Sequence, residues 1–330
     1  MGKNIFVTGG SGFIGSNLVE RLLQHGHNVY AIMRRQDQVI DRRIKHIKGD
    51  ILAPETFSNV IKGFDFVFHT AAYISFNKKD FEKAYEINVI GTRNLLEASY
   101  RAGVEKVVHL SACSVLGFSK NKDTIFFETS NPEIGKGNVY AYTKKLAEEE
   151  VQKYAQKGMD ISIANISTVY GQGDRKLNSG TVIKSIYEGK LRFVPPGGTS
   201  FVSVNDLIDG LLLLLEKGRP GERYIFCTEN LEYIMLAKRI AKVLGVKEPR
   251  YVLPRFSYYP ASWVLKIREF LPASTADKVN LITPQILKES FAYKYYSSEK
   301  ARRELGWKPL QNLEIAVEKA FKYYRDNRLL

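Results

Sequence analysis

The sequence predicts an α/β fold, a doubly wound parallel sheet with a smaller, mostly helical C-terminal domain. Short apolar strands alternate with helical patterns over the first half of the chain, beginning with a strand at 5–7 and a helix at 13–24. Such alternation is typical of parallel sheets with helices on both faces. With 330 residues, the chain can form one large domain or two smaller ones.

The other expected elements follow in order along the chain. Strands are predicted at 28–33, 44–48, 65–70, 106–111, 160–166, 201–204 and 224–226, and helices at 54–61, about 80–102, 139–157 and 205–215. The last hundred residues have a mostly helical pattern that is broken by prolines. We therefore expect a first domain of residues 1–170 plus about 199–235, and a second of about 171–198 plus 236–330.

The composition is that of an ordinary globular protein with an excess of basic residues. Hydrophobic residues make up 44% of the chain and charged residues 25%, and the net charge is +14. The basic residues are scattered over predicted helices and loops and form no long tract, so no nucleic-acid partner is expected. Attraction to an anionic cofactor or substrate explains the charge better.

Two cysteines, Cys113 and Cys227, are too few for a disulfide framework, and the five histidines form no metal-spaced cluster with them. No metal site is therefore expected. The N-terminus lacks a signal-peptide pattern, and the most apolar run, residues 211–215, is too short to span a bilayer. We expect a cytoplasmic protein with no membrane partner.

A glycine-rich turn directly follows the first strand. Gly9, Gly12 and Gly15 stand between that strand and a helix that begins near Phe13 and Ile14. The first glycine permits a tight turn, the second lets the backbone approach a pyrophosphate, and the third lets the helix pack on the strand. The free N–H groups at the helix N-terminus attract phosphate. These five residues therefore predict a dinucleotide-binding site.

Tyr140 and Lys144 are four residues apart on the helix expected at 139–157, which puts both side chains on one face. An ammonium group beside a phenol favours the phenolate, and so we expect Lys144 to lower the pKa of Tyr140. Such a tyrosine can transfer a proton to or from an alcohol or ketone while a hydride moves at the same carbon. The pair therefore predicts the catalytic residues of a redox enzyme.

Together these motifs resemble the extended short-chain dehydrogenase/reductases, the NAD-dependent epimerase/dehydratase family, nearly from end to end. The matching segments are TGGSGFIG (8–15), GDI (49–51), HTAA (69–72), NVIGT (88–92), YAYTK (140–144), YGQGD (170–174), FVSVNDL (201–207) and ELGWKP (304–309). The resemblance implies a Rossmann-like dinucleotide-binding first domain and a substrate-binding second domain. It selects Tyr140 over Tyr142, because only Tyr140 has the motif's lysine four residues later.

The resemblance also assigns roles to individual residues. Tyr140 would be the acid/base, and Lys144 would in addition bind the nicotinamide ribose. Further cofactor contacts are implied for Asp50, Ile51, Thr70, Ala71 and Ala72. Family members often dimerise through the two helices near 80–102 and 139–157, and so a homodimer is expected.

The end of the second strand bears on the choice of cofactor. An acidic residue there binds the ribose 2′-hydroxyl of NAD, whereas arginine suits the 2′-phosphate of NADP. This chain has Arg34 and Arg35 and no acid before Asp37. We therefore predict NADP, with NAD as the alternative and solvated loop charges as the simpler explanation of the arginines.

Two segments depart from the family pattern. Ala112 stands where the family has a serine or threonine that hydrogen-bonds the reacting oxygen. Ser111 and Cys113 should point to the other face of the strand, and Ser114 lies about 6.5 Å further along an extended chain. Either a neighbour substitutes after a bend, or catalysis runs without this hydroxyl. Asn165 and its neighbours replace an Arg-Pro pair and favour the dihydroflavonol-reductase-like branch.

The leading hypothesis is an NADP(H)-dependent oxidoreductase acting on a secondary alcohol or ketone. The alternatives are a nucleotide-sugar epimerase or dehydratase with retained NAD(P), and a dinucleotide-binding sensor or assembly protein with weak catalysis. The loop at 118–138 and the helical segments after Pro254 are expected to set the substrate. An apolar group in the C-terminal segment could line a substrate pocket or a dimer face, but we favour a position in the core of the second domain. Its members are Trp263, Val264, Leu265, Ile267, Phe270 and Leu271.

Overall fold

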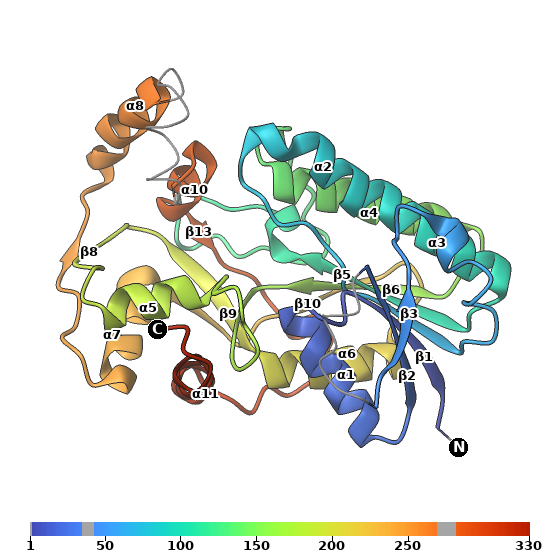
Figure 1. Cartoon of the computed structure of the whole chain (residues 1–330). Coiled ribbons are helices and arrows are strands. Elements are labelled where there is room, and N and C mark those ends of the chain that lie inside the picture. Colours follow the sequence, from blue (N-terminus) through green and yellow to red (C-terminus); the bar gives the residue numbers. More distant parts are fainter. Residues whose placement is uncertain (1, 35–42, 269–281) are drawn as a thin grey trace.

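Strand β1 (Asn4–Thr8) lies inside the molecule, and its apolar side chains are buried on both faces. The computed structural model describes residues 2–34, 43–268 and 282–330. The other strands of its sheet are β2 (Asn28–Met33), β3 (Lys45–Lys48), β4 (Phe66–His69), β5 (Lys106–Ala112), β6 (Ile161–Ile166) and β10 (Arg223–Phe226). Within the described ranges, seven parallel strands run in the order β10-β6-β5-β4-β1-β2-β3 (Figure 1).

Helices cover both faces of this sheet. One face carries α1 (Phe13–Gln24) and α6 (Val204–Lys217), and the other carries α3 (Gly91–Ala102) and α4 (Val139–Gln156) (Figure 1). Successive side chains of a strand point to opposite faces, so Ile5 packs toward α1 and α6, and Phe6 packs toward α3 and α4. The predicted doubly wound parallel sheet is confirmed.

The strand order places a topological switch point at the carboxyl edge of the sheet. β1 and β4 are neighbours, yet the chain leaves β1 toward β2 and β3, and leaves β4 toward β5 and β6. The connections therefore diverge above the ends of β1 and β4, which is where open α/β sheets bind ligands. Residues that follow β1, β4 and β5 meet at this edge.

The helical stretch expected near 80–102 is present, but it is not a uniform α-helix. A turn at Lys78–Asp80 leads into α2 (Phe81–Tyr85), a π-helical segment at Glu86–Ile90 and then α3. π-helical segments inside α-helices are frequent at functional sites. This one contains Asn88, whose contacts reach the predicted catalytic helix.

The helix predicted at 54–61 is wrong. A 3-10 turn at Pro54–Thr56 is followed by separate turns, closed by bonds from the N–H of Ser58 to the carbonyl of Pro54 (2.8 Å) and from the N–H of Ile61 to the carbonyl of Phe57 (2.9 Å), and no continuous helix forms. The Thr56 hydroxyl donates to the carbonyl oxygen of Ala53 (2.6 Å) and accepts from the backbone N–H of Asp50 (3.1 Å). Such local bonds compete with helix propagation.

A second sheet lies beside the first. Its strands are β7 (Thr168–Tyr170), β9 (Gly198–Ser203), β11 (Glu229–Glu232) and β13 (Tyr293–Lys294), and the nearby helices are α5 (Gly180–Tyr187), α7 (Tyr233–Leu244) and α11 (Leu313–Asp326). The expected division into two domains stays a prediction. β9 and β11, which it assigns to the first domain, pair in this second sheet, whereas β10 belongs to the large one.

The remaining elements form a projection at one end of the molecule (Figure 1). They are β8 (Phe193–Val194), β12 (Tyr251–Val252), α8 (Tyr258–Arg268) and α10 (Pro284–Ser290). Trp263 is 67% exposed and Val264 60% exposed. The preference for a core position is therefore wrong for these two residues, while Phe270 and Leu271 lie outside the described residues.

Candidate dinucleotide and catalytic site

The turn after β1 has a shape that only glycine permits at two positions. Gly9 has φ +70°, and a Cβ there would lie 2.7 Å from the backbone nitrogen of Ala71. A Cβ on Gly15 would lie 2.2 Å from the carbonyl oxygen of Gly9. The turn is closed by Gly12, whose N–H donates to that same carbonyl (2.9 Å). The glycines thus bring the start of α1 against the ends of β1 and β4.

The N-terminus of α1 fits the diphosphate of a dinucleotide. Gly12 is the N-cap, no side chain caps the helix, and its first turn holds no acidic residue. The first N–H groups of a helix, here those of Phe13 and Ile14, have no partner within the helix and attract anions. A Cβ on Gly12 would meet only the Gly9 oxygen, at 3.2 Å, so its other side is open to a ligand.

His69, at the end of β4, links the turn to α3 and is a neutral ring. Thr92 Oγ1 donates to the carbonyl of Asn88 (2.6 Å) and therefore accepts from His69 Nε2 (2.8 Å). His69 Nδ1 in turn accepts from Thr8 Oγ1 (2.7 Å), which accepts from the N–H of Ala71 (3.2 Å). The proton lies on Nε2, and the chain of bonds fixes the end of β1.

Acid should destabilise the protein through His69. Burial, with a smaller effect of the Lys144 charge, lowers the pKa of His69 from 6.5 to about 3. Between these values the unfolded chain binds a proton that the folded chain does not, so the free energy of unfolding falls as the pH falls through this window. Titration of His69 alone should lower the free energy of unfolding by about 2 kcal/mol between about pH 7 and pH 5.

Urea unfolding at the two pH values measures this loss. His69→Gln keeps a donor and an acceptor but cannot titrate, and its stability should depend less on pH by that amount. Equal pH dependence in the two proteins would contradict the assignment.

The implied cofactor segment 70–72 lies directly against the glycine turn. Thr70 Oγ1 donates to the carbonyl of Thr8 (2.6 Å), and a Cβ on Gly15 would approach Thr70 Oγ1 to 2.9 Å. Thr70 and Ala71 are partly exposed and Ala72 is exposed. The segment is therefore fixed to β1 and remains open to a ligand at the carboxyl edge.

The residues implied near the adenine follow β3 and contact α3. Ile51 is buried, its carbonyl accepts from Asn94 Nδ2 (3.0 Å), and a Cβ on Gly91 would lie 2.6 Å from its Cδ1. Asp50 is partly exposed, and its Oδ1 accepts from the N–H of Leu52 (3.0 Å). Asp50 and Ile51 thus lie where β3 ends, and Ile51 packs against α3.

Arg34 follows β2 directly and its side chain is exposed, while Arg35 lies outside the described residues. The N–H of Gly49 donates to the carbonyl of Met33 (3.1 Å), which ties the end of β2 to the end of β3. Arg34 and Asp50 each stand one residue beyond this tie. Both therefore lie at the carboxyl edge, on the side to which the chain turns from β1.

The side chain of Lys144 is buried between α4 and the end of β5. Its Nζ donates to the carbonyl of Leu110 (2.5 Å) and lies 3.4 Å from His109 Nε2. Burial lowers the pKa of Lys144 to about 8, and the carboxylate of Glu148 acts in the opposite direction. The ammonium group thus stands at the carboxyl edge, one turn from Tyr140.

Tyr140 is partly exposed, and its ring lies edge-on to Phe76 at 6.1 Å. Burial raises the pKa of Tyr140 to about 12. The prediction that Lys144 lowers this pKa is wrong for the present arrangement, because the Lys144 bonds lead to β5. Both side chains nevertheless lie on the face of α4 that the four-residue spacing indicated.

Asn88 connects the π-helical segment to α4. It is buried, exchanges two bonds with the backbone of Tyr73 (2.7 and 3.0 Å), and its Nδ2 donates to Thr143 Oγ1 (3.0 Å). Thr143 replaces the family's serine in the motif that holds Tyr140. Its hydroxyl therefore fixes α4, one residue from Lys144.

The chain bends where the family's hydroxyl is missing. β5 ends at Ala112, and Cys113–Leu116 form a single turn. Within 111–117 only Ser114 is partly exposed, but its Oγ itself is buried and has no partner among the described residues. The Ser111 Oγ also lacks such a partner, but Ser111 is 1% exposed within the strand.

A buried charge network that the sequence did not reveal supports this bend. Glu148 accepts from Asn165 Nδ2 (2.8 Å) and from Arg223 Nε (2.7 Å), and Asn165 Nδ2 also lies 3.3 Å from the carbonyl of Ala112. In the sequence, only the position of Glu148 four residues after Lys144 indicates that the two side chains share a face of α4. Asn165 and Arg223 come from distant strands, so only the fold brings them there.

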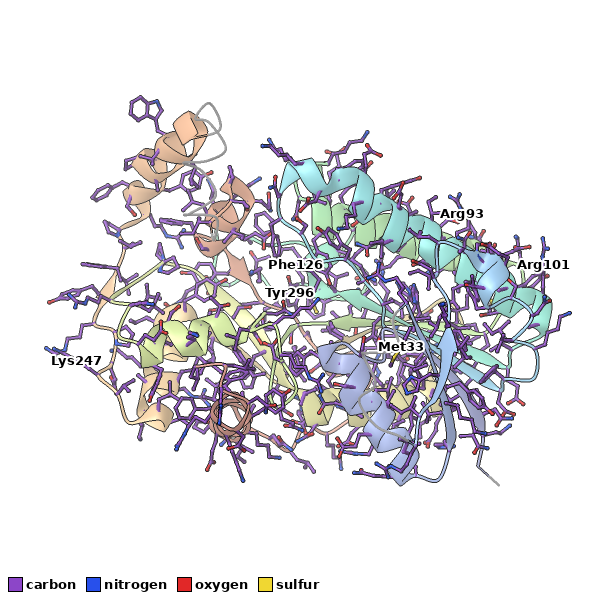
Figure 2. The ribbon with its side chains drawn as sticks, in the orientation of Figure 1. Met33, Arg93, Arg101, Phe126, Lys247 and Tyr296 are labelled. Carbon is purple, nitrogen blue, oxygen red and sulfur yellow. The ribbon has the colours of Figure 1, made fainter. Side chains whose placement is uncertain are left out.

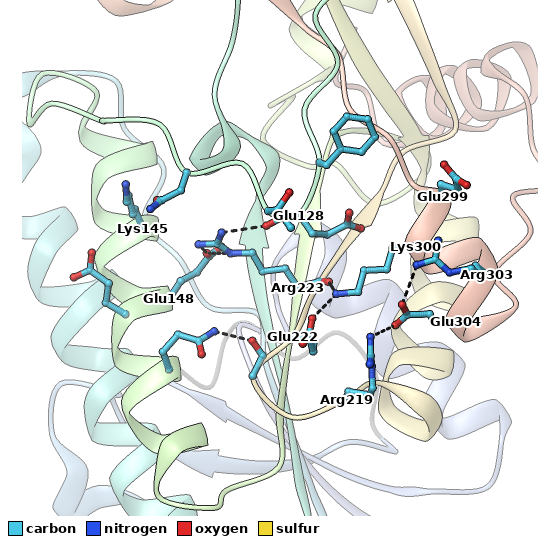
Figure 3. A pocket seen from close by; sticks show the side chains of 16 residues that line it. Glu128, Lys145, Glu148, Arg219, Glu222, Arg223, Glu299, Lys300, Arg303 and Glu304 are labelled. Carbon is cyan, nitrogen blue, oxygen red and sulfur yellow. Dashed lines mark hydrogen bonds and ion pairs between the residues drawn. The ribbon is translucent and has the colours of Figure 1, made fainter.

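A cavity of about 980 Å³ lies along the edge strand β10 and is lined by charged side chains. Many of these are paired with one another, as Arg223 with Glu148, Lys300 with Glu222, and Arg219 with Glu304 (Figure 3). Neither Tyr140 nor Lys144 lines it, and neither does the glycine turn. The cavity is therefore separate from the candidate site.

The whole chain is similar to known enzymes. The sequence profile of the NAD dependent epimerase/dehydratase family matches residues 5–227. Sterol demethylase protein B of Methylococcus capsulatus is 30% identical over 331 residues, 98% of this chain and 99% of that protein. A 3-beta-hydroxysteroid dehydrogenase of Mycolicibacterium neoaurum is 28% identical, over 98% of this chain and 91% of that protein.

Among solved structures, that of gox2253 has a TM-score of 0.84 and 29% identity, and covers 98% of either chain. The chain therefore belongs to the NAD-dependent epimerase/dehydratase family, and it is an NAD(P)-dependent enzyme of the extended short-chain dehydrogenase/reductase type.

Proposed function

We propose that this enzyme is an NADP(H)-dependent oxidoreductase that interconverts a secondary alcohol and its ketone, with Tyr140 as the acid/base. The observation that carries the proposal is the position of Lys144. Its ammonium group bonds to the end of β5, one helical turn from the partly exposed Tyr140. In a parallel sheet, that end lies on the same edge as the glycine turn after β1.

In the direction of reduction, a nicotinamide cofactor held by the glycine turn and the N-terminus of α1 would supply the hydride that the carbonyl carbon accepts. Tyr140 then donates its proton to the carbonyl oxygen, which becomes the alcohol. A phenol with a pKa of about 12 holds this proton firmly until negative charge develops on the substrate oxygen. Lys144, which bonds to the end of β5, would hold the nicotinamide ribose beside this phenol.

Substrate turnover separates this proposal from the two alternatives. The purified enzyme is mixed with NADPH and a panel of ketones. The panel begins with 3-ketosteroids, because similar proteins are named as sterol or hydroxysteroid enzymes. We expect a net fall in the absorbance of reduced nicotinamide. An epimerase that regenerates its cofactor gives no net change, and a sensor binds NADPH without turnover. Either outcome would refute the oxidoreductase.

The preference for NADP rests on Arg34 and Arg35. Replacing both by alanine should raise the KM for NADPH about 10- to 100-fold, because a charged hydrogen bond to a phosphate is lost, and should leave the KM for NADH nearly unchanged. Steady-state kinetics with both cofactors measures this difference. Lys190→Ala is a suitable control, since this exposed lysine lies in the turn after α5, far from β2 in the chain. Equal losses for NADPH and NADH would remove the argument.

Ser114 should replace the hydroxyl that Ala112 lacks. Its side chain stands in the turn directly after β5, and its buried Oγ lacks a protein partner within the described chain, so a substrate oxygen that reaches it on binding would supply that partner. Ser114→Ala should lower kcat about 10- to 100-fold with little change in the KM for cofactor. Ser111→Ala, in the buried strand, is the control. Unchanged kcat in Ser114→Ala would show that catalysis does not use this hydroxyl.

A further inference from the structure

Large apolar side chains crowd the outer surface of the projecting end of the molecule. We call this surface the aromatic lobe and define it by Phe193, Tyr251, Phe256, Tyr259, Trp263 and Val264. Each is more than half exposed, from 57% for Phe193 to 72% for Phe256 and Tyr259. Figure 1 shows α8 standing away from the two sheets. Contiguous apolar surface of this kind marks an interaction site.

Three of the aromatic side chains share one face of a helix. Phe256 lies in the turn Arg255–Ser257 that leads directly into α8, and Tyr259 and Trp263 follow at helical spacing. The adjacent Tyr258 is partly buried and packs edge-on against both Phe291 (5.6 Å) and Tyr259 (5.7 Å). Contacts with α10 therefore hold α8 by one side and leave the aromatic face outward.

The strands before α8 extend this surface. The rings of Phe193 on β8 and Tyr251 on β12 are stacked at 5.5 Å, and both are exposed. The N–H of Leu253 donates to the carbonyl of Val194 (2.8 Å), which fixes the chain just before it enters α8. The exposed ring of Tyr251 thus lies five residues before Phe256, in the segment that leads into α8.

Basic residues flank the aromatic lobe in the sequence. Arg192 and Arg250 directly precede Phe193 and Tyr251, and Lys247 lies at the left of the molecule in Figure 2. All three are exposed, and none forms an ion pair with another described residue. The chain as a whole carries a net charge of +14.

The combination of exposed aromatic and basic side chains indicates the kind of partner. Helices that lie in a membrane interface present Trp, Tyr and Phe to the headgroup region and Lys or Arg to anionic lipid. At low salt, the net charge of +14 favours an anionic surface over a second copy of this chain as the partner of this lobe. We propose that the aromatic lobe binds the surface of an anionic phospholipid bilayer, with α8 lying in the headgroup region.

This contact does not require a transmembrane segment. In the described part of the chain, no helix is both long and apolar enough to cross a bilayer. The expectation of no membrane partner considered only a spanning segment. A surface contact of this kind is also independent of the reaction that the enzyme catalyses.

The test uses the full-length protein with vesicles of phosphatidylcholine alone, or of phosphatidylcholine mixed with phosphatidylglycerol. Cosedimentation should occur with the anionic vesicles and weaken with added salt. The chain has two tryptophans, and Trp307 is buried while Trp263 is exposed. A blue shift of tryptophan emission on binding should therefore come from Trp263 and vanish in Trp263→Phe, which still binds.

Variants assign the contact to the aromatic lobe. Phe256→Ser combined with Trp263→Ser should weaken vesicle binding at least about tenfold, as should Lys247→Glu combined with Arg250→Glu. Leu310→Ser, at a residue that is 82% exposed outside the lobe, is the matched control and should bind as the parent does. Unchanged thermal unfolding confirms that each variant is folded.

Three results would overturn the proposal. The first is no cosedimentation with the anionic vesicles, and the second is equal binding by the parent and the two lobe variants. The third is a dimer, seen by sedimentation velocity, that both lobe variants abolish while vesicles remain unbound. That result would assign the aromatic lobe to a second copy of the chain.

Discussion

Tyr140→Phe should lower kcat for the reaction of an alcohol or ketone substrate about 100- to 10,000-fold, which is the usual contribution of a general acid or base. Phenylalanine keeps the ring that packs against Phe76 and removes only the hydroxyl that carries the proton. The KM for cofactor should change little, because the glycine turn and the α1 N-terminus remain intact. Stopped-flow or steady-state measurement of reduced nicotinamide gives both constants.

Tyr142 provides a matched control on the same helix. Its ring contacts Phe81 at 6.1 Å, and it lacks the lysine four residues later. Tyr142→Phe should therefore retain nearly full activity. If Tyr140→Phe kept the parent's kcat, or if the two variants lost activity equally, the acid/base would have to be another group and the redox proposal would lose its main support.

Gly15→Ala should abolish measurable dinucleotide binding. The new Cβ would lie 2.2 Å from the Gly9 carbonyl oxygen and 2.9 Å from Thr70 Oγ1, so the backbone of the turn must move. Moving it displaces the N–H groups of α1 from the position that fits a diphosphate. We expect at least a hundredfold weaker cofactor binding, and about 1–3 kcal/mol lower stability from overpacking.

Titration with NADPH fluorescence and urea unfolding measure these two effects separately. Gly135→Ala is the control, because no heavy atom lies within 4 Å of a Cβ built there and its φ is not positive. It should bind and unfold as the parent does. A Gly15→Ala protein that is less stable but binds NADPH normally would show that the turn is structural only.

The sequence was informative wherever a pattern is local. Alternating strands and helices predicted the parallel sheet, and the strand-glycine-helix order placed Gly9 and Gly15 in a turn that only glycine permits. The four-residue spacing correctly put Tyr140 and Lys144 on one face of α4. Local patterns failed at 54–61, where separate short turns form in place of a continuous helix.

Properties that depend on distant residues were not readable in this way. The pKa of Tyr140 is raised because the fold buries the phenol, and Lys144 bonds to Leu110, which lies 34 residues away in the chain. Glu148 is buried beside Asn165 and Arg223, which come from two other strands. Burial and partner choice are consequences of packing and leave no periodic signal in the sequence.

The same distinction explains α8. Its apolar residues have a helical pattern, but the pattern does not say whether another element covers them. The contact of Tyr258 with Phe291 decides which side of α8 faces inward and leaves Trp263 in solvent. Thus the sequence by itself determined the sheet, the glycine turn and the Tyr140–Lys144 spacing, because these follow from local backbone geometry. The tertiary structure alone decided which side chains are buried, paired or exposed, because those states depend on contacts between distant segments.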